Sequence, residues 1–142
     1  MMCPCGSGTP YEQCCGVYHR GAPAPTPEAL MRSRYTAFVR GDAAYLHRTH
    51  APETRPARYE LDPNIQYFAL KVHSAVGNTV EFSAHYLVKN QPTAAIPGGI
   101  LAGLGEGIPG VQRELSRFRK EGNQWLYVAG TMKADAKTGG SP

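Results

Sequence analysis

The spacing of hydrophobic residues changes once along the chain, from a helical period to a strand period. Residues 27–40 carry apolar side chains such as Leu30 and Phe38 at helical spacing. Thr26 is a preferred N-cap residue, and Gly41 is typical of the position just after a helix. The pattern therefore predicts an amphipathic helix that ends at Gly41.

A second, shorter helix is expected directly after the first. Asp42 is a suitable N-cap, and Tyr45 and Leu46 provide an apolar side. Residues 49–63 contain three prolines and show no period, so they indicate a loop or a broken helix.

From residue 65 onward apolar and polar positions alternate, as in half-buried strands. Tight turns are indicated at Gly77-Asn78, between IQYFALKVHSAV and TVEFSAHYLV, and at Gly122-Asn123, between VQRELSRFRKEG and QWLYVAG. In the second strand one face is expected to carry Val80, Phe82, Ala84, Tyr86 and Val88, and the other Glu81, Ser83, His85 and Leu87.

Two helices followed by an antiparallel sheet make an α+β fold. Its core is predicted to draw on a set of large apolar and aromatic side chains, namely Leu30, Phe38, Phe68, Leu70, Phe82, Phe118, Trp125 and Tyr127.

Composition limits the class of protein. The chain has 142 residues, about the size of one domain, and 42% of them are hydrophobic. Its formal net charge of +4 is compatible with direct nucleic-acid binding, but no run of like charges favours it. No apolar stretch approaches the roughly 20 residues that span a bilayer, and no signal-peptide pattern begins the chain. We therefore expect a cytoplasmic protein without a membrane segment.

All four cysteines lie within the first fifteen residues, at Cys3, Cys5, Cys14 and Cys15. Soft ligands this close in sequence suit a tetrahedral zinc ion, and four cysteine ligands leave no position for water. The cysteines are therefore predicted to hold one structural Zn²⁺ ion. Turns that bring the two pairs together need backbone with positive φ, which the neighbouring glycines adopt at little cost, namely Gly6, Gly8 and Gly16.

The residues alone leave three other uses of these cysteines open. Adjacent cysteines could form a vicinal disulfide, or the two pairs could be bridged, although a reducing cytoplasm disfavours both. The thiols could be free redox groups, but the C-x-x-C spacing of that chemistry is absent. His19 could replace one sulfur as a zinc ligand.

The stretch C-P-C-G-S-G-x-x-Y-x-x-C-C-G closely resembles the SEC-C motif, a small zinc element of the SecA translocation ATPase and of many other bacterial proteins. The resemblance implies that Cys15 is the fourth ligand, where SecA-type copies often have histidine. Because the SecA counterpart contacts a chaperone and the ribosome, it also implies a protein or ribosomal partner. Tyr11 lies between the ligands, and aromatic residues on rigid elements are common interface anchors, so Tyr11 is the predicted partner-binding residue.

The chain also resembles the bacterial YchJ family, in which a SEC-C motif precedes a domain of the nuclear transport factor 2-like fold. Besides the motif, the matching segments are PTPEALMRSRYTAFVRGDAAYL and RELSRFRKEGNQWLYVAG. The resemblance implies a zinc knuckle over 1–22, followed over 23–131 by a cone-shaped domain of helices against a curved antiparallel sheet. A short proline-rich linker joins the two parts, and residues 132–142 are expected to form a disordered tail.

One stretch departs from that family pattern. Residues 90–111, NQPTAAIPGGILAGLGEGIPGV, stand where a short connection between strands is expected. They mix glycines with apolar residues, so they are interpreted either as a flexible insertion or as a lid or partner-binding segment.

Polar residues that could face the inside of such a cone are Tyr35, His50, His73, His85, Glu114 and Ser116. His85 and Glu114 are the best candidate pair, because both lie on predicted strands where an imidazole and a carboxylate could meet. Arg32 and Arg34 are candidates either for anion binding or for ion pairs with carboxylates, namely Glu28, Asp42 or Glu114.

Two functions follow from these patterns. The first is a zinc-binding adaptor, not an enzyme, whose knuckle docks a protein or ribosomal partner. The second is a small-molecule enzyme or ligand carrier that uses a pocket around Tyr35, His85 and Glu114. A closed polar cavity at these residues would favour the second function, and a filled cone would favour the first.

Overall fold

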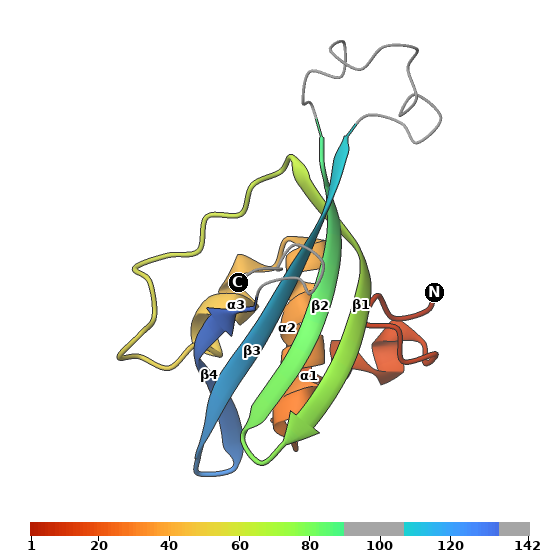
Figure 1. Cartoon of the computed structure of the whole chain (residues 1–142). Helices are drawn as coiled ribbons and strands as arrows, with labels where there is room; N and C mark the ends of the chain where they lie inside the picture. Colours follow the sequence, from red (N-terminus) through yellow and green to blue (C-terminus); the bar gives the residue numbers. More distant parts are fainter. Residues whose placement is uncertain (90–106, 134–142) are drawn as a thin grey trace, which may run out of the picture.

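The centre of the molecule is an antiparallel sheet of four strands that pair in the order of the sequence. In the computed structural model, which describes residues 1–89 and 107–133, the strands are β1 (Ile65–Val76), β2 (Thr79–Val88), β3 (Ile108–Glu121) and β4 (Gln124–Met132). The sheet is curved, and the helices lie against its concave side (Figure 1). The α+β fold predicted from the sequence is therefore confirmed.

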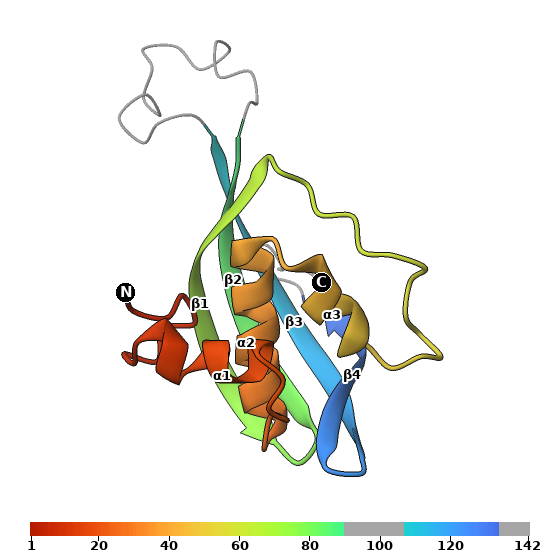
Figure 2. The ribbon, with the colours of Figure 1, turned by 180° about the vertical axis from the view of Figure 1, so that it is seen from behind.

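The helices of the described part are η1 (Tyr11–Gln13), α1 (Cys15–His19), α2 (Pro27–Arg40) and α3 (Ala43–Arg48). The longest of them, α2, runs along the concave face of the sheet, with α1 and α3 on either side of it (Figure 2). The Thr26 hydroxyl accepts a hydrogen bond of 3.0 Å from the Ala29 N–H, and Gly41, at φ 74°, ends the helix. Both ends of α2 are therefore fixed by the residues that the sequence indicated.

The hydrophobic core lies between α2 and the sheet. Most of the predicted core residues are buried in it or packed at its edge, namely Leu30, Phe38, Leu70, Phe82, Phe118, Trp125 and Tyr127. Phe68 is the exception, because it is 55% exposed. A β-bulge between Tyr67 and Ala69 shifts the alternation of β1 by one residue, which turns Phe68 outward while Tyr67 and Leu70 pack inward.

The N-terminal knuckle packs directly on α2. Three of its cysteines are buried in the same cluster as the core of the domain, namely Cys3, Cys5 and Cys15. The segment that joins the two parts is also fixed, because Ala24 is buried and the Pro25 carbonyl accepts a hydrogen bond of 3.2 Å from the Trp125 indole. The division of the chain near residue 22 stays a prediction, but the two parts share one core.

Two features expected from the sequence lie largely outside the described residues. They are the glycine-rich stretch over 90–111, of which only residues 107–111 are described, and the tail over 132–142. In the described part β3 begins at Ile108 and β4 ends at Met132. No helix there is long and apolar enough to span a membrane.

Candidate functional site

The four cysteines form one candidate site, a metal centre. Their Sγ atoms all lie within 4.8 Å of one another. Four sulfurs around a tetrahedral zinc ion lie about 3.8 Å apart, given Zn–S bonds of about 2.3 Å. The Sγ atoms of Cys5 and Cys14 are 3.7 Å apart, which fits that geometry. Cys3, Cys5, Cys14 and Cys15 are thus arranged to hold a single tetrahedral metal ion.

Two of the alternatives for these cysteines disagree with the structure. All four cysteines are free, so none forms a disulfide. Both ring nitrogens of His19 have other partners: Nδ1 lies 2.7 Å from the Tyr11 hydroxyl, and Nε2 lies 2.9 Å from the Ser33 carbonyl oxygen. His19 therefore positions the knuckle and does not replace a sulfur.

Glycines shape the turn between the cysteine pairs, as expected. Gly6 and Gly8 have φ values of 83° and 84°. Between them, the Ser7 hydroxyl lies 3.2 Å from the Cys14 sulfur. Gly16 was predicted to share the positive φ but is helical, and it is needed for a different reason. A side chain at this position would meet the Tyr11 carbonyl at 2.7 Å.

Polar side chains of helix α2 form hydrogen bonds with the cysteine cluster. The Thr36 hydroxyl donates a hydrogen bond of 3.3 Å to the Cys15 sulfur and lies 3.7 Å from the Cys3 sulfur. Nη1 of Arg32 donates a hydrogen bond of 2.7 Å to the Cys5 carbonyl. Such outer contacts orient ligand atoms and stabilise their charge.

The cysteine thiols also interact with one another. A hydrogen bond with the Cys15 thiol lowers the pKa of Cys5 to about 4, and the same bond raises the pKa of Cys15. One thiolate is therefore favoured at neutral pH, and a metal ion that bound here would displace the protons that the other thiols retain.

Tyr11, the predicted partner-binding residue, has contacts within the chain. Its hydroxyl lies 2.7 Å from His19 Nδ1, and the Arg40 guanidinium lies 4.0 Å from the centre of its ring. The contact with Arg40 fastens the knuckle to α2, whereas the hydrogen bond with His19 lies within the knuckle. Between Cys5 and Cys14 the exposed residues of the knuckle are instead small or polar, namely Gly6, Ser7, Gly8, Glu12 and Gln13.

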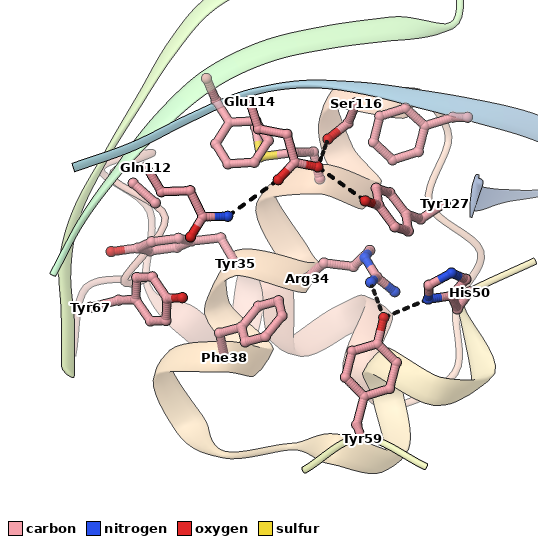
Figure 3. A pocket seen from close by; sticks show the side chains of 14 residues that line it. Arg34, Tyr35, Phe38, His50, Tyr59, Tyr67, Gln112, Glu114, Ser116 and Tyr127 are labelled. Carbon is pink, nitrogen blue, oxygen red and sulfur yellow. Dashed lines mark hydrogen bonds between the residues drawn. The ribbon is translucent and has the colours of Figure 1, made fainter. Parts of the chain in front are cut away.

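A cavity of about 280 Å³ between α2 and the concave face of the sheet forms a second candidate site (Figure 3). Aromatic residues of α2 and β1 make part of its wall, namely Tyr35, Phe38 and Tyr67. Polar and charged side chains also line it, namely Arg34, His50, Tyr59, Gln112, Glu114, Ser116 and Tyr127. A cavity with apolar walls and polar groups that can fix the orientation of a ligand is typical of small-molecule sites.

The cavity contains two of the three predicted pocket residues. Tyr35 and Glu114 line it, but His85 does not. Glu114 lies opposite Phe82 in the sheet, whereas His85 lies opposite Val111 and its ring is 6.0 Å from that of the exposed Phe68. Phe82 and His85 are three positions apart on β2, so their side chains point to opposite faces of the sheet. His85 therefore lies on the face away from Glu114, and the predicted pairing of the two is wrong.

Of the other two histidines expected to face the inside of the cone, His50 lines the cavity and His73 does not. His73 Nε2 lies 2.7 Å from the Ser83 hydroxyl, on the strand face that His85 shares, and does not line the cavity. The imidazole in the cavity belongs to His50, which follows α3 and forms a parallel bridge with Tyr127 of β4.

Arg34 is a charged residue of the cavity that is only 6% exposed. Its Nη1 donates hydrogen bonds to the Leu46 carbonyl at 2.9 Å and to the Thr49 hydroxyl at 2.7 Å, and its Nη2 donates to the Tyr59 hydroxyl at 2.8 Å. Its guanidinium also lies 4.5 Å from the centre of the Tyr127 ring. Within residues 1–89 and 107–133 it has no carboxylate partner.

The ion pair expected for Arg32 is present, at 3.0 Å from Glu28. Arg34 differs because it forms none of the expected pairs with carboxylates in the described part of the chain. The ion-pair interpretation is therefore confirmed for Arg32, and anion binding stays a prediction for Arg34.

Glu114 is the carboxylate of the cavity and is 9% exposed. Its Oε2 accepts hydrogen bonds from the Ser116 hydroxyl at 2.8 Å and the Tyr127 hydroxyl at 3.0 Å, and its Oε1 accepts one from the Gln112 amide at 3.2 Å. Gly130 of β4 leaves room for the carboxylate, since any side chain there would collide with Glu114. Among the described residues Glu114 has no cationic partner.

His50 is neutral at pH 7. Burial lowers its pKa to about 4, and the nearby positive charges of Arg34 and Arg55 add to the effect. Its Nδ1 lies 2.5 Å from the Tyr59 hydroxyl. The same Tyr59 hydroxyl accepts the hydrogen bond from Arg34 and therefore joins Arg34 to His50. Burial also raises the pKa of Tyr35 to about 12, so this hydroxyl stays protonated.

The phenols of Tyr59 and Tyr127 are functional groups that the sequence did not single out. Tyr59 lies in the segment 49–63, which shows no period, so no face could be assigned to it. Tyr127 was expected only as a core residue. The alternation of β4 does not indicate that its hydroxyl would donate to the carboxylate of Glu114.

A four-cysteine knuckle, with its sulfurs arranged for a metal ion, packs on a cone-shaped α+β domain with an internal polar cavity. This combination defines a class of small α+β proteins with an N-terminal cysteine knuckle. Residues 26–130 match the family model described as the YchJ middle NTF2-like domain, and residues 2–16 match that of the SEC-C motif. The chain therefore belongs to the YchJ family, as the resemblance in its sequence indicated.

Similar proteins cover nearly the whole chain. A protein of Deinococcus radiodurans named UPF0225 protein is 42% identical over 127 residues, which cover 89% of this chain and 85% of the relative. A UPF0225 protein of Streptomyces coelicolor is 44% identical over 136 residues, with 90% and 93% covered. The solution structure of a SEC-C motif-containing protein from Rhodopseudomonas palustris has a TM-score of 0.72 at 32% identity and covers 94% of this chain and 100% of its own.

Proposed function

We propose that this protein binds a compact small molecule in the cavity between α2 and the sheet. One observation carries the proposal: within the described residues, the cavity contains a buried arginine without a carboxylate, Arg34, and a buried carboxylate without a cation, Glu114. A buried charge is costly unless it is compensated. Because only neutral groups bind either charge, both are available to a ligand.

We also propose that the metal of the knuckle is one Zn²⁺ ion with a structural role. Thiolates prefer soft or borderline metal ions, and a tetrahedral site of four cysteines suits zinc. Such a site leaves no position for water or substrate, so chemistry at the metal is not expected. The zinc would hold the knuckle against α2, the helix that carries Arg34 and Tyr35 of the cavity.

The ligand-binding proposal is tested with a library of compact organic molecules and the full-length, zinc-loaded protein. Saturable shifts in amide NMR signals are expected at residues around the cavity. The substitution Ala84→Phe fills the cavity, because Ala84 is buried in its wall, and should abolish these shifts. Val111→Phe, on the outer face of the neighbouring strand, is the matched control and should leave them unchanged.

Thermal unfolding of both variants checks that they fold. Absence of saturable binding to the wild-type protein would contradict the proposal. Binding that persists in a folded Ala84→Phe variant would contradict it as well, because the ligand would then occupy another place.

The adaptor function predicted from the SEC-C resemblance is the second candidate. The observation in its favour is that the exposed part of the knuckle, including Ser7, Gly8 and Glu12, is held in a fixed shape by the cysteine cluster. A preformed loop loses little conformational entropy when a protein or ribosomal partner binds. The charge reversal Glu12→Lys should weaken capture of such a partner without altering the cavity.

A further inference from the structure

Arg34 has unused hydrogen-bonding capacity. A guanidinium has five N–H donors, and three of them reach the Leu46 carbonyl and the hydroxyls of Thr49 and Tyr59. The Nε–H and the second proton of Nη2 have no acceptor within residues 1–89 and 107–133. The group is therefore held rigidly by three bonds and by the Tyr127 ring, and it can still donate to an anion.

Glu114 has unused capacity of the opposite kind. A carboxylate offers about four acceptor positions. Ser116 and Tyr127 both donate to Oε2, whereas Gln112 is the single described donor to Oε1 and lies at 3.2 Å. A further acceptor position on Oε1 is therefore free for a hydroxyl or amine of a ligand.

Tyr127 sets the distance between these two charges. The Arg34 guanidinium lies 4.5 Å from the centre of the Tyr127 ring, and the hydroxyl of the same ring donates at 3.0 Å to Glu114 (Figure 3). The two charges are thus separated by about one phenol side chain. A ligand that contacts both Arg34 and Glu114 must therefore carry its anionic group and its hydrogen-bond donor at opposite ends of a scaffold about as long as a phenol ring.

The remaining wall of the cavity suits a flat ring. The ring centres of Phe38 and Tyr67 are 5.8 Å apart, and those of Tyr35 and Tyr67 are 6.0 Å apart, with tilted or edge-on planes. Aromatic rings pack favourably in such arrangements. The volume of about 280 Å³ lies just below the usual range for ligand sites, which favours a single-ring compound.

We infer that the cavity selects a planar, single-ring carboxylic acid with a hydroxyl or amine at the opposite end, which lies with its carboxylate at Arg34 and its donor at Glu114. The inference rests on the proposed ligand-binding function and names the class of ligand that the site binds. The reverse orientation is unfavourable, because it would place two carboxylates together at Glu114.

The test uses 4-hydroxybenzoate and two analogues as probes, titrated into the full-length, zinc-loaded protein at pH 7. 4-Hydroxybenzamide keeps the shape and the hydroxyl but has no charge, and benzoate keeps the charge but has no hydroxyl. We expect 4-hydroxybenzoate to bind about tenfold or more tightly than either analogue, since the amide loses the ionic interaction with Arg34 and benzoate loses the hydrogen bond to Glu114. This comparison leaves the protein unchanged, so folding of a variant cannot confuse it.

Two variants then assign the ends of the ligand. Glu114→Gln should weaken binding of 4-hydroxybenzoate and 4-hydroxybenzamide about tenfold and leave benzoate unchanged. Arg34→Lys, which keeps the charge but loses the planar fork, should weaken the two carboxylates and spare the amide. Arg117→Met and Glu81→Gln, on the outer face of the sheet, are the matched controls and should change none of the three affinities.

Equal binding of 4-hydroxybenzoate and 4-hydroxybenzamide would overturn the inference. An equal loss of all three probes in a folded Glu114→Gln variant would also overturn it. In either case the proposed function still holds if the probes bind the wild-type protein but not the Ala84→Phe variant, because they then bind in the cavity. If none of the three probes binds while other library compounds do, this inference alone is wrong, and if nothing binds the cavity, both are wrong.

Discussion

The Thr36 hydroxyl donates a hydrogen bond of 3.3 Å to the sulfur of Cys15. Thr36 follows directly after Arg34 and Tyr35 in α2, and these two residues line the cavity. One helix therefore supports the cysteine cluster with one side chain and forms a wall of the cavity with its neighbours. Loss of the metal should therefore also change the structure of the cavity, because α2 contacts both sites.

We expect the purified protein to contain one Zn²⁺ ion per chain, measured by elemental analysis after purification under reducing conditions without chelator. Cys14→Ser should lose the ion, because three thiolates and a hydroxyl no longer provide four soft ligands. Amide hydrogen exchange over residues 1–20 should then become faster. A metal-free protein with a well-protected N-terminus would contradict the zinc assignment.

Thr36→Val should lower zinc affinity about tenfold, since outer contacts of metal ligands typically contribute that much. Valine keeps the shape of threonine and removes the donor to Cys15. Competition with a coloured chelator measures the affinity. Ser33→Ala is the matched control, because Ser33 is buried in the same helix but bonds to Tyr45 and not to a cysteine. The same loss of affinity in both variants would show that only helix stability matters.

Deletion of residues 1–22 should leave the α+β domain folded but less stable. The deletion uncovers the side of α2 that carries Thr36, which is fully buried in the intact protein. Circular dichroism should show a cooperative thermal transition at a lower temperature than that of the full chain. If no cooperative transition remains, the knuckle is an obligatory part of the core and the division near residue 22 is wrong.

Stability should fall between pH 6.5 and pH 4 because of His50. Its pKa is about 4 in the folded protein and near 6.5 in an unfolded chain, so the unfolded state binds more protons in this window. The contribution is complete above pH 6.5 and is lost as pH falls, by up to about 3 kcal/mol. Urea unfolding at several pH values measures it.

His50→Asn should flatten this part of the pH profile. The Asn side chain can still form a hydrogen bond with Tyr59 but does not titrate. At pH 7.5 the variant should unfold at nearly the same urea concentration as the wild type, which checks that its fold is intact. An unchanged slope between pH 6.5 and pH 4 would assign the effect to other groups.

Tyr11→Ala should loosen the knuckle, whatever its effect on a partner. The substitution removes the hydrogen bond to His19 and the stacking of Arg40. Tyr11→Phe keeps the stacking and loses only the hydrogen bond, so it should show a smaller increase in hydrogen exchange over residues 1–20. If both variants exchange like the wild type, Tyr11 is free to act as the interface anchor that the sequence suggested.

Local rules in the sequence predicted most of the secondary structure. The N-cap at Thr26, the stop at Gly41 and the turns at Gly77 and Gly122 depend on neighbouring residues only, so they could be assigned without a fold. The four cysteines were assigned together for the same reason, since their spacing in sequence already limits the distances between their sulfurs.

The cavity was predictable only in part, because it depends on which face of a strand each residue occupies. The alternation of β2 correctly separated His85 from Phe82, yet His85 was paired with Glu114 before the register of β2 against β3 was known. Phe68 was placed in the core because nothing in the sequence of β1 indicates its bulge.

The sequence by itself determined the α+β order of elements and the grouping of the four cysteines, because both arise from contacts between residues that are close in the chain. Tertiary structure alone decided that Arg34 has no carboxylate partner in the part of the chain that the structure describes, that Tyr59 joins Arg34 to His50, and that Tyr127 connects Arg34 with Glu114. These relationships join α2, a loop without period and two strands. Their partners are far apart in sequence, and only the packing of the helix into the curved sheet brings them together.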